Sequence, residues 1–192
     1  MNFIKHSIKK NSSFLELVNE CKSNFYLKPS SPNTKKIKKK FLDFYSKKIK
    51  KNRIVFNYNK NEKIFFPYIK MGTQTSLGLF AYYEHNIFLY YLNNFGYYKK
   101  AADIGANLGL HSIILSKIGY KVDVFEPDPK HFTILKENLK NHKCKNVKLF
   151  AKAIYNSRKK IEFTRVLGNT MANHISGYKN NVHGKIETFI VE

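Results

Sequence analysis

Two acids and a glycine-containing stretch are the residues of this chain best suited to bind a ligand. The stretch DIGANLG runs from Asp103 to Gly109, between a short apolar run and a run with helical spacing. Glu126 follows a second apolar run, close to the ~20-residue spacing at which an acid binds the ribose hydroxyls of a nucleotide. A strand, a glycine turn and a helix in this order place backbone N–H groups at the carboxyl edge of a parallel sheet, where ligands bind.

The residues of the turn argue against a pyrophosphate ligand. In turns that bind nicotinamide dinucleotides the pattern is G-x-G-x-x-G, and the second glycine lets the backbone approach the pyrophosphate. Here Asn107 occupies that position, and Asp103 precedes the first glycine by two residues. Because a carboxylate repels a pyrophosphate and attracts an ammonium, the turn favours S-adenosylmethionine, which carries an ammonium and a sulfonium but no phosphate. Asp103 would bind its amino-acid end, and Glu126 its ribose.

The remaining residues of the turn are small. Gly105, Ala106 and Gly109 leave room for the cofactor to lie over the turn. One carboxylate orients two ribose hydroxyls without a metal, so no metal site is expected. The alternative interpretation is that Asp103 and Glu126 are ordinary surface acids at strand ends.

Three stretches resemble the FkbM family of S-adenosylmethionine-dependent methyltransferases. They are DIGANLGLHS, VFEPDP and YYEHNIFLYYL, and the similarity covers roughly residues 80–165. The resemblance implies a class I Rossmann-like fold and O-methylation of sugars, glycans or related small molecules. The cofactor contacts that it implies here are Glu84, Asp103, Gly105, Ala106, Asn107, Gly109, Glu126, Pro127 and Ala153. Glu84 would add to the methionine end, and Pro127 and the strand end near Ala153 would lie beside the adenine.

No general base is evident from the sequence. Methyl transfer from a sulfonium is an in-line displacement, which depends on holding the acceptor oxygen collinear with the methyl group. A hydroxyl acceptor also needs a base within hydrogen-bond reach. His85, His111 and His174 are candidates, but none has a partner at a recognisable spacing, so the catalytic residues stay unassigned.

The elements that must position these residues alternate between strands and helices. Strands are predicted for residues 53–58, 63–69, 99–104, 121–126, 146–154, 159–166 and 185–191. Helices are predicted for residues 86–95, from the glycine turn to 118, and from Pro129 to about 142, the last capped by Asp128. The first two strands should form a hairpin with Pro67 near an end, and MGTQTSLG after them reads as a loop.

This order of elements predicts an α/β fold with right-handed crossovers. We expect a class I Rossmann-like methyltransferase fold, with a mostly parallel sheet and helices on both faces. A complete domain of this class needs a further series of strands after residue 155, so the chain looks truncated at its C-terminus. The unpaired apolar edge that would result predicts self-association, or a second chain that completes the sheet.

Three segments are expected along the chain. They are a lysine-rich helical extension (1–52), a hairpin and loop (53–80), and the cofactor-binding part of a methyltransferase domain (81–192). In the extension, Pro29 and Pro32 mark a loop, and apolar residues then recur at helical spacing at Ile37, Phe41, Phe44 and Tyr45. This predicts a basic amphipathic helix over 35–51, which either binds an anionic membrane or a nucleic acid, or covers the domain with its apolar stripe.

The formal net charge of +22, from 35 basic and 13 acidic side chains, attracts polyanions. Only Arg53, Arg158 and Arg165 are arginines, however, and specific phosphate and base recognition favours the planar arginine fork. The lysine surplus is therefore interpreted mainly as a solvated surface. A nucleic-acid-binding module or nucleic-acid methyltransferase is one alternative function, and an inactive truncated remnant is another.

Cysteine content and hydropathy predict a cytoplasmic location. Cys21 and Cys144 form no disulfide framework, which fits a reducing compartment. The sequence has no apolar run of about 18 residues and no export signal at its amino terminus.

Overall fold

The computed structural model describes residues 13–20, 39, 41–72, 74–79, 83–179 and 183–192. It divides into two compact units, which are Met1–Ile69 with Ser76–Tyr90, and Lys70–Thr75 with Tyr91–Glu192. The first unit joins most of the predicted extension and hairpin, and the glycine turn lies wholly in the second. The predictions for Pro29, Pro32, Ile37 and Cys21 lie outside the described residues.

The first unit has an aromatic core around helix α1 (Phe14–Glu20). A reciprocal capping box starts this helix, since Ser13 N–H donates to Glu16 Oε2 at 2.7 Å and Glu16 N–H donates to Ser13 Oγ at 3.3 Å. Phe14 is buried, and its ring centroid lies 5.7 Å from that of Phe56 and 5.3 Å from that of Phe88. Residues from distant parts of the unit therefore share one core.

The helix predicted over 35–51 is shorter in the part that the structure describes. Residues 41–46 are helical, but Ile49–Lys50 forms strand β1, which pairs antiparallel with the start of the hairpin. Backbone pairing with a neighbouring strand thus overrides the helical pattern at this end. Phe41, Phe44 and Tyr45 are buried, as expected if the apolar stripe covers a domain.

The predicted hairpin is confirmed. Strands β2 (Arg53–Asn57) and β3 (Lys63–Pro67) pair antiparallel. Alternate side chains on both strands are buried, and these are Ile54, Phe56, Ile64 and Phe66. Pro67 stands at the end of β3, where a missing N–H is tolerated.

The segment MGTQTSLG is not the plain loop that the sequence predicts. Strand β4 (Lys70–Met71) pairs with β5 (Gln74–Thr75), and the short helix α3 (Ser76–Gly78) follows. Ser76 Oγ donates to the carbonyl of Pro67 at 2.6 Å and accepts from the N–H of Ile69 at 3.0 Å, which holds the segment in place. Helix α4 (His85–Asn94) then begins one residue earlier than predicted.

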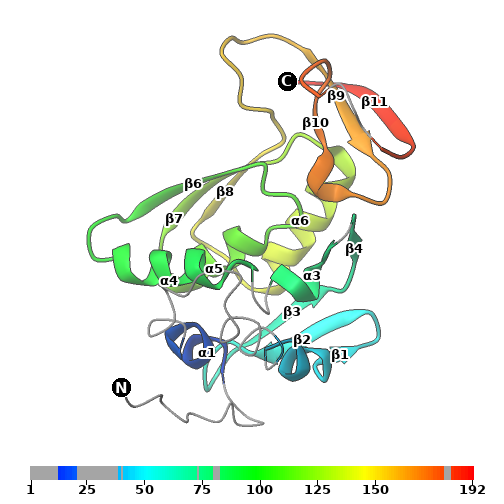
Figure 1. Ribbon diagram of the computed structural model, residues 1–192. Helices are drawn as coiled ribbons and strands as arrows, with labels where there is room; N and C mark the ends of the chain where they lie inside the picture. The colour runs from blue at the N-terminus through cyan, green and yellow to red at the C-terminus, as the bar shows by residue number, and fades with distance from the viewer. Residues whose placement is uncertain (1–12, 21–38, 40, 73, 80–82, 180–182) are drawn as a thin grey trace, which may run out of the picture. The chain divides into compact units, whose positions relative to one another are not determined.

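A three-stranded parallel sheet forms the centre of the second unit (Figure 1). Its strands are β6 (Lys100–Ile104), β7 (Lys121–Phe125) and β8 (Val147–Phe150), in that order, joined by α5 (Leu110–Ile118) and α6 (Pro129–Asn141). This confirms the predicted alternation of strands and helices. As predicted, α5 ends before Gly119, which has φ 118°, and Asp128 caps α6 by accepting from the N–H groups of Lys130 and His131.

Helices α5 and α6 lie on the same face of this sheet, not on both faces as predicted (Figure 1). Val122 and Val124 of β7 are buried, whereas Asp123 between them is exposed. Ile104 of β6 is 62% exposed. Both crossovers run in the same direction along the sheet, and right-handed crossovers then place both helices on one face.

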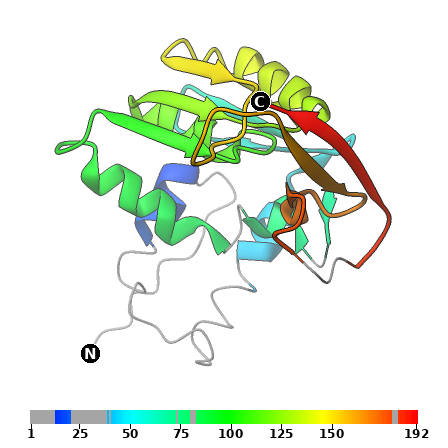
Figure 2. The same cartoon turned by 90° about the horizontal axis from the view of Figure 1, so that it is seen from above.

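A second, antiparallel sheet ends the described chain. Strand β9 (Ile161–Val166) pairs with β11 (Ile186–Val191), beside which it lies in Figure 2, and with the short β10 (His174–Ile175). Both strands predicted here are confirmed, but they pair with each other and do not extend the parallel sheet. The 3-10 turn η3 (Thr170–Ala172) lies in the connection from β9 to β10.

Within the described ranges, no helix has the length and apolar character needed to cross a membrane.

Candidate functional site

The glycine turn joins β6 to α5 and is held against β7. The N–H groups of Gly105 and Ala106 both donate to the carbonyl of Phe125, at 2.9 and 3.0 Å. Gly105 has φ 73°, and a Cβ placed there would meet no described atom within 4 Å, so the backbone beside it is open. Gly109 has φ 88°, and a Cβ there would lie 2.5 Å from Leu135 Cδ1. Glycine at this position therefore lets α5 pack against α6.

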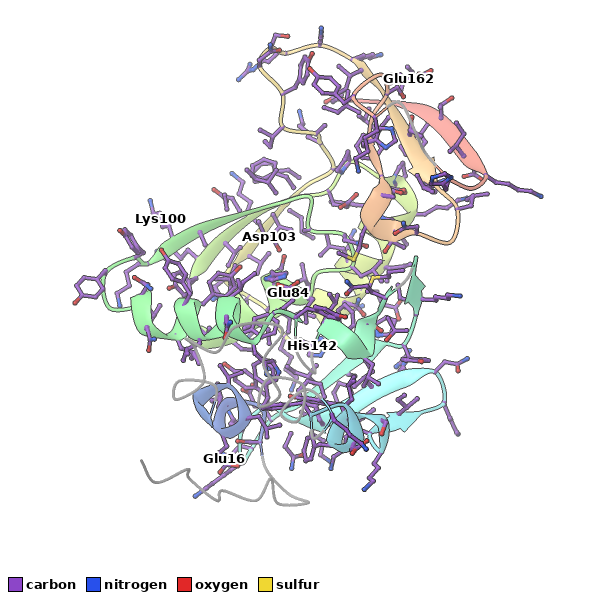
Figure 3. All side chains as sticks on the ribbon, viewed as in Figure 1. Glu16, Glu84, Lys100, Asp103, His142 and Glu162 are labelled. Carbon is purple, nitrogen blue, oxygen red and sulfur yellow. The ribbon has the colours of Figure 1, made fainter. Side chains whose placement is uncertain are left out.

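Asp103 lies at the carboxyl end of β6, away from Lys100 at the start of the strand (Figure 3). Ser112, a buried residue of α5, donates from Oγ to Asp103 Oδ2 at 2.5 Å and so orients the carboxylate. Asp103 is half-buried, and the described residues offer no hydrogen bond to its other oxygen. Ser112 was not predicted as part of the site, because a serine inside a helical pattern carries no signal of its partner.

Glu126 is bonded directly to the turn, so the structure brings the second-strand acid and the glycine stretch together. Asn107 N–H donates to Glu126 Oε2 at 2.6 Å, and Asp128 N–H donates to Glu126 Oε1 at 2.9 Å. Each oxygen accepts one bond and keeps further lone-pair capacity. Glu126 is only 4% exposed, and this burial raises its pKa to about 7, although the two N–H groups act in the opposite direction.

Asn107 links the turn to the antiparallel sheet. Its φ of 53° is left-handed, a conformation that asparagine tolerates better than most residues. Its Nδ2 donates to Thr170 Oγ1 at 3.1 Å and to the carbonyl of Thr170 at 3.4 Å. Its Oδ1 is buried and has no hydrogen-bond partner among the described residues. The turn thus presents one unsatisfied acceptor next to the two acids.

A buried ion pair holds the antiparallel sheet next to this site. Arg165 of β9 donates through Nε to Asp128 Oδ2 at 2.5 Å and through Nη2 to Asp128 Oδ1, while its Nη1 donates to Glu187 Oε2 at 2.5 Å. Asn173 Nδ2 also donates to Asp128 Oδ2, at 3.1 Å. Burial alone would raise the pKa of Asp128, but the Arg165 hydrogen bonds bring it below its ordinary value. The sequence predicts Asp128 only as a helix cap, and the rarity of arginine in the chain was the available signal for Arg165.

The remaining predicted contacts are less central. Pro127 is buried between the two acids of the β7–α6 connection. Strand β8 ends at residue 150, so Ala153 does not lie at the end of this strand as predicted. The Ala153 N–H donates to the carbonyl of Glu192 at 2.7 Å, and the side chain packs against the small core of the antiparallel sheet. Glu84 belongs to the first unit, where its carbonyl accepts from Phe88 N–H at 2.9 Å. Cofactor contacts by these three residues stay predictions.

The three candidate histidines have different surroundings. His85 is buried in the first unit, 4.7 Å from Phe41 between ring centroids. His111 Nδ1 is 3.1 Å from Tyr91 Oη, and His174 Nδ1 is 2.8 Å from the carbonyl of Ala172. These contacts give no reason to assign any of them as a base.

The chemistry of the site fits S-adenosylmethionine better than a pyrophosphate. The N–H groups of Gly105 and Ala106 are engaged by the sheet, so they are not directed at a phosphate. Asp103 has a carboxylate oxygen for an ammonium, and Glu126 has lone pairs for hydroxyl donors. The backbone beside Gly105, two residues after Asp103, is open.

No model of a protein family matches the chain, and no curated protein matches its sequence. Among solved structures, the chain is similar to a SAM-dependent methyltransferase from Agrobacterium tumefaciens, at 12% sequence identity and a TM-score of 0.40. The alignment covers 55% of this chain and 34% of that protein. The chain thus spans about a third of that protein's length, and a similarity this distant assigns no function.

Proposed function

We propose that the chain binds S-adenosylmethionine at the glycine turn and transfers its methyl group to an oxygen of a sugar-like or other small-molecule acceptor. The observation that carries this proposal is the turn itself, in which the N–H groups of Gly105, Ala106 and Asn107 are engaged and the carboxylates of Asp103 and Glu126 keep acceptor capacity. The resemblance to the FkbM family supports the same cofactor and is the reason for preferring an oxygen acceptor.

Each side chain has a distinct part in this proposal. Asp103, oriented by Ser112, binds the ammonium of the cofactor, and Glu126 accepts the ribose hydroxyls. Asn107, tied to Thr170, keeps the turn in its left-handed conformation beside both acids. When bound, the cofactor supplies an electrophilic methyl group on its sulfonium.

The high positive charge of the chain does not oppose this binding strongly. Exposed charges farther away than about 10 Å are largely screened at 0.1 M salt, whereas partly buried charges in contact are not. Asp103 lies directly at the turn and is half-buried, so its carboxylate favours a cationic ligand there.

Calorimetry with S-adenosylhomocysteine tests the proposal on the full chain. Hydrogen bonds to charged groups contribute about 1.5–3 kcal/mol, so Asp103→Asn and Glu126→Gln should each weaken binding at least roughly tenfold. Asp123→Asn is the matched control, because Asp123 is exposed on β7 next to the site strand. Equal affinity of both site variants and the wild type would rule out this site. Failure of the folded wild type to bind would rule out the cofactor.

A further inference from the structure

A groove runs between the C-terminal half of α6 and strand β8, and we call it the α6–β8 groove. Its volume is about 420 Å³, within the ~300–1,000 Å³ range of ligand pockets. Leu139 of α6 and Val147 and Leu149 of β8 contribute its apolar lining. Figure 3 labels His142, the C-cap of α6, at this end of the helix. The groove belongs to the second unit alone and does not depend on the proposed function.

Lysines dominate the polar lining of the groove. They are Lys136, Lys140, Lys143 and Lys145, all exposed, and no acid lines the groove. Lysine near a helix C-terminus is favourable by itself, which explains Lys140 and Lys143. It does not explain Lys136, one turn earlier, or Lys145, on the approach to β8. The groove therefore combines an apolar floor with a concentration of positive charge.

Strand β8 is the edge of its sheet on the groove side. Among the described residues, its one neighbouring strand is β7. The N–H groups of Val122 and Glu126 donate to the carbonyls of Asn146 and Phe150. Since backbone groups of successive strand residues point to opposite sides, those of Val147 and Leu149 point to the outer edge. The same two residues line the groove, so an added strand would run along its wall.

The charges select which strand this edge can accept. The four groove lysines lie beside the edge strand, on α6 and on the connection before β8, and they repel a second copy of this chain, which carries a net charge of +22. A strand with acidic side chains is attracted to this edge, because each acid gains a lysine neighbour. Nucleic acid is less well matched, since no arginine or aromatic residue lines the groove.

We propose that the α6–β8 groove binds an extended acidic segment of a partner protein, which adds to β8 as an edge strand and places alternate acidic side chains against the four lysines. Backbone hydrogen bonds to Val147 and Leu149 supply affinity in this mode, and the lysines supply selectivity.

Fluorescence anisotropy with labelled peptides tests the proposal on the full chain. The probe is a peptide of about eight residues that alternates glutamate and valine, a typical strand length. It should bind at least roughly tenfold more tightly than the matching lysine–valine peptide, and its affinity should fall with added salt. The combined substitution Lys136→Gln, Lys140→Gln and Lys143→Gln should weaken binding roughly tenfold. Lys148→Gln, on the opposite face of β8, is the matched control and should bind normally.

Strand addition is tested separately from charge. Val147→Pro removes an N–H that points outward, so it should abolish peptide binding while the sheet, checked by circular dichroism, stays intact. A glutamate–valine peptide with N-methyl groups along one edge tests the same point without altering the protein. Undiminished binding of this peptide would overturn strand addition. Equal, lysine-dependent binding of a single-stranded oligonucleotide or of phosphatidylserine vesicles would overturn selectivity for an acidic strand. S-adenosylhomocysteine affinity should be unchanged in every groove variant.

Discussion

The two ends of α6 carry opposite charges in opposite environments. At its N-terminus, Asp128 is fully buried, and with Asp103 and Glu126 it belongs to a cluster whose carboxylates are held by fixed donors. At its C-terminus, the lysines of the α6–β8 groove are exposed to solvent. Both placements suit the helix dipole, but charges interact far more strongly where water is excluded. Substitutions at the acidic end of α6 should therefore lower the free energy of unfolding strongly, and substitutions at the lysine end should change it little.

The largest effect is expected for Arg165→Met. This substitution leaves Asp128 buried without its partner, and breaking a buried ion pair costs about 3–5 kcal/mol. Urea denaturation measures the loss in the free energy of unfolding. Arg158→Met, an exposed arginine, and Lys140→Met in the groove should each change it by less than about 0.5 kcal/mol. A loss for Arg165→Met no larger than in these controls would remove the contrast between the two ends.

Glu126→Gln should change how stability depends on pH. The ordinary pKa of glutamate, 4.5, applies to the unfolded chain, and burial raises the pKa of Glu126 to about 7 in the folded protein. The folded protein holds a proton on the Glu126 carboxyl more tightly than the unfolded chain does. The resulting stabilisation is complete below pH 4.5 and is lost as the pH rises through 7, by about 3 kcal/mol in total. Denaturation curves between pH 4 and 8 should show that the difference in the free energy of unfolding between the wild type and Glu126→Gln changes with pH. Glu137→Gln, exposed on α6, provides the control, and a pH-independent difference for Glu126→Gln would contradict the prediction.

The smallest effect is expected at the link between the turn and the antiparallel sheet. Thr170→Val removes the Oγ1 acceptor of Asn107 Nδ2 but leaves the weaker contact to the Thr170 carbonyl, so we expect a loss of about 1 kcal/mol. Thr133→Val, which removes an exposed bond within α6, should have almost no effect on the same denaturation midpoint. A loss above about 3 kcal/mol for Thr170→Val would mean that this link stabilises the folded protein as much as the ion pair does.

Local signals in the sequence predicted much of the second unit. Gly119 and Asp128 mark the end of α5 and the start of α6, and both were predicted because capping depends on residues within a few positions. The helical spacing of apolar residues gave a wrong prediction at Ile49–Lys50, where pairing with β2 replaces the expected helix. The prediction of helices on both faces of the parallel sheet was also wrong, because α5 and α6 lie on one face. These outcomes depend on neighbours that periodicity does not identify.

The sequence by itself predicted the ligand chemistry of the turn, because Asp103, Asn107 and Glu126 are recognised by residue type and by their spacing along one strand–turn–helix–strand unit. Only the tertiary structure decided which groups orient these side chains. Ser112 reaches Asp103 across the first turn of α5, Arg165 reaches Asp128 from 37 residues away, and Thr170 reaches Asn107 from 63. Such pairs form only after the chain has folded, when each donor and acceptor loses water and must be satisfied by whichever partner the packing brings near.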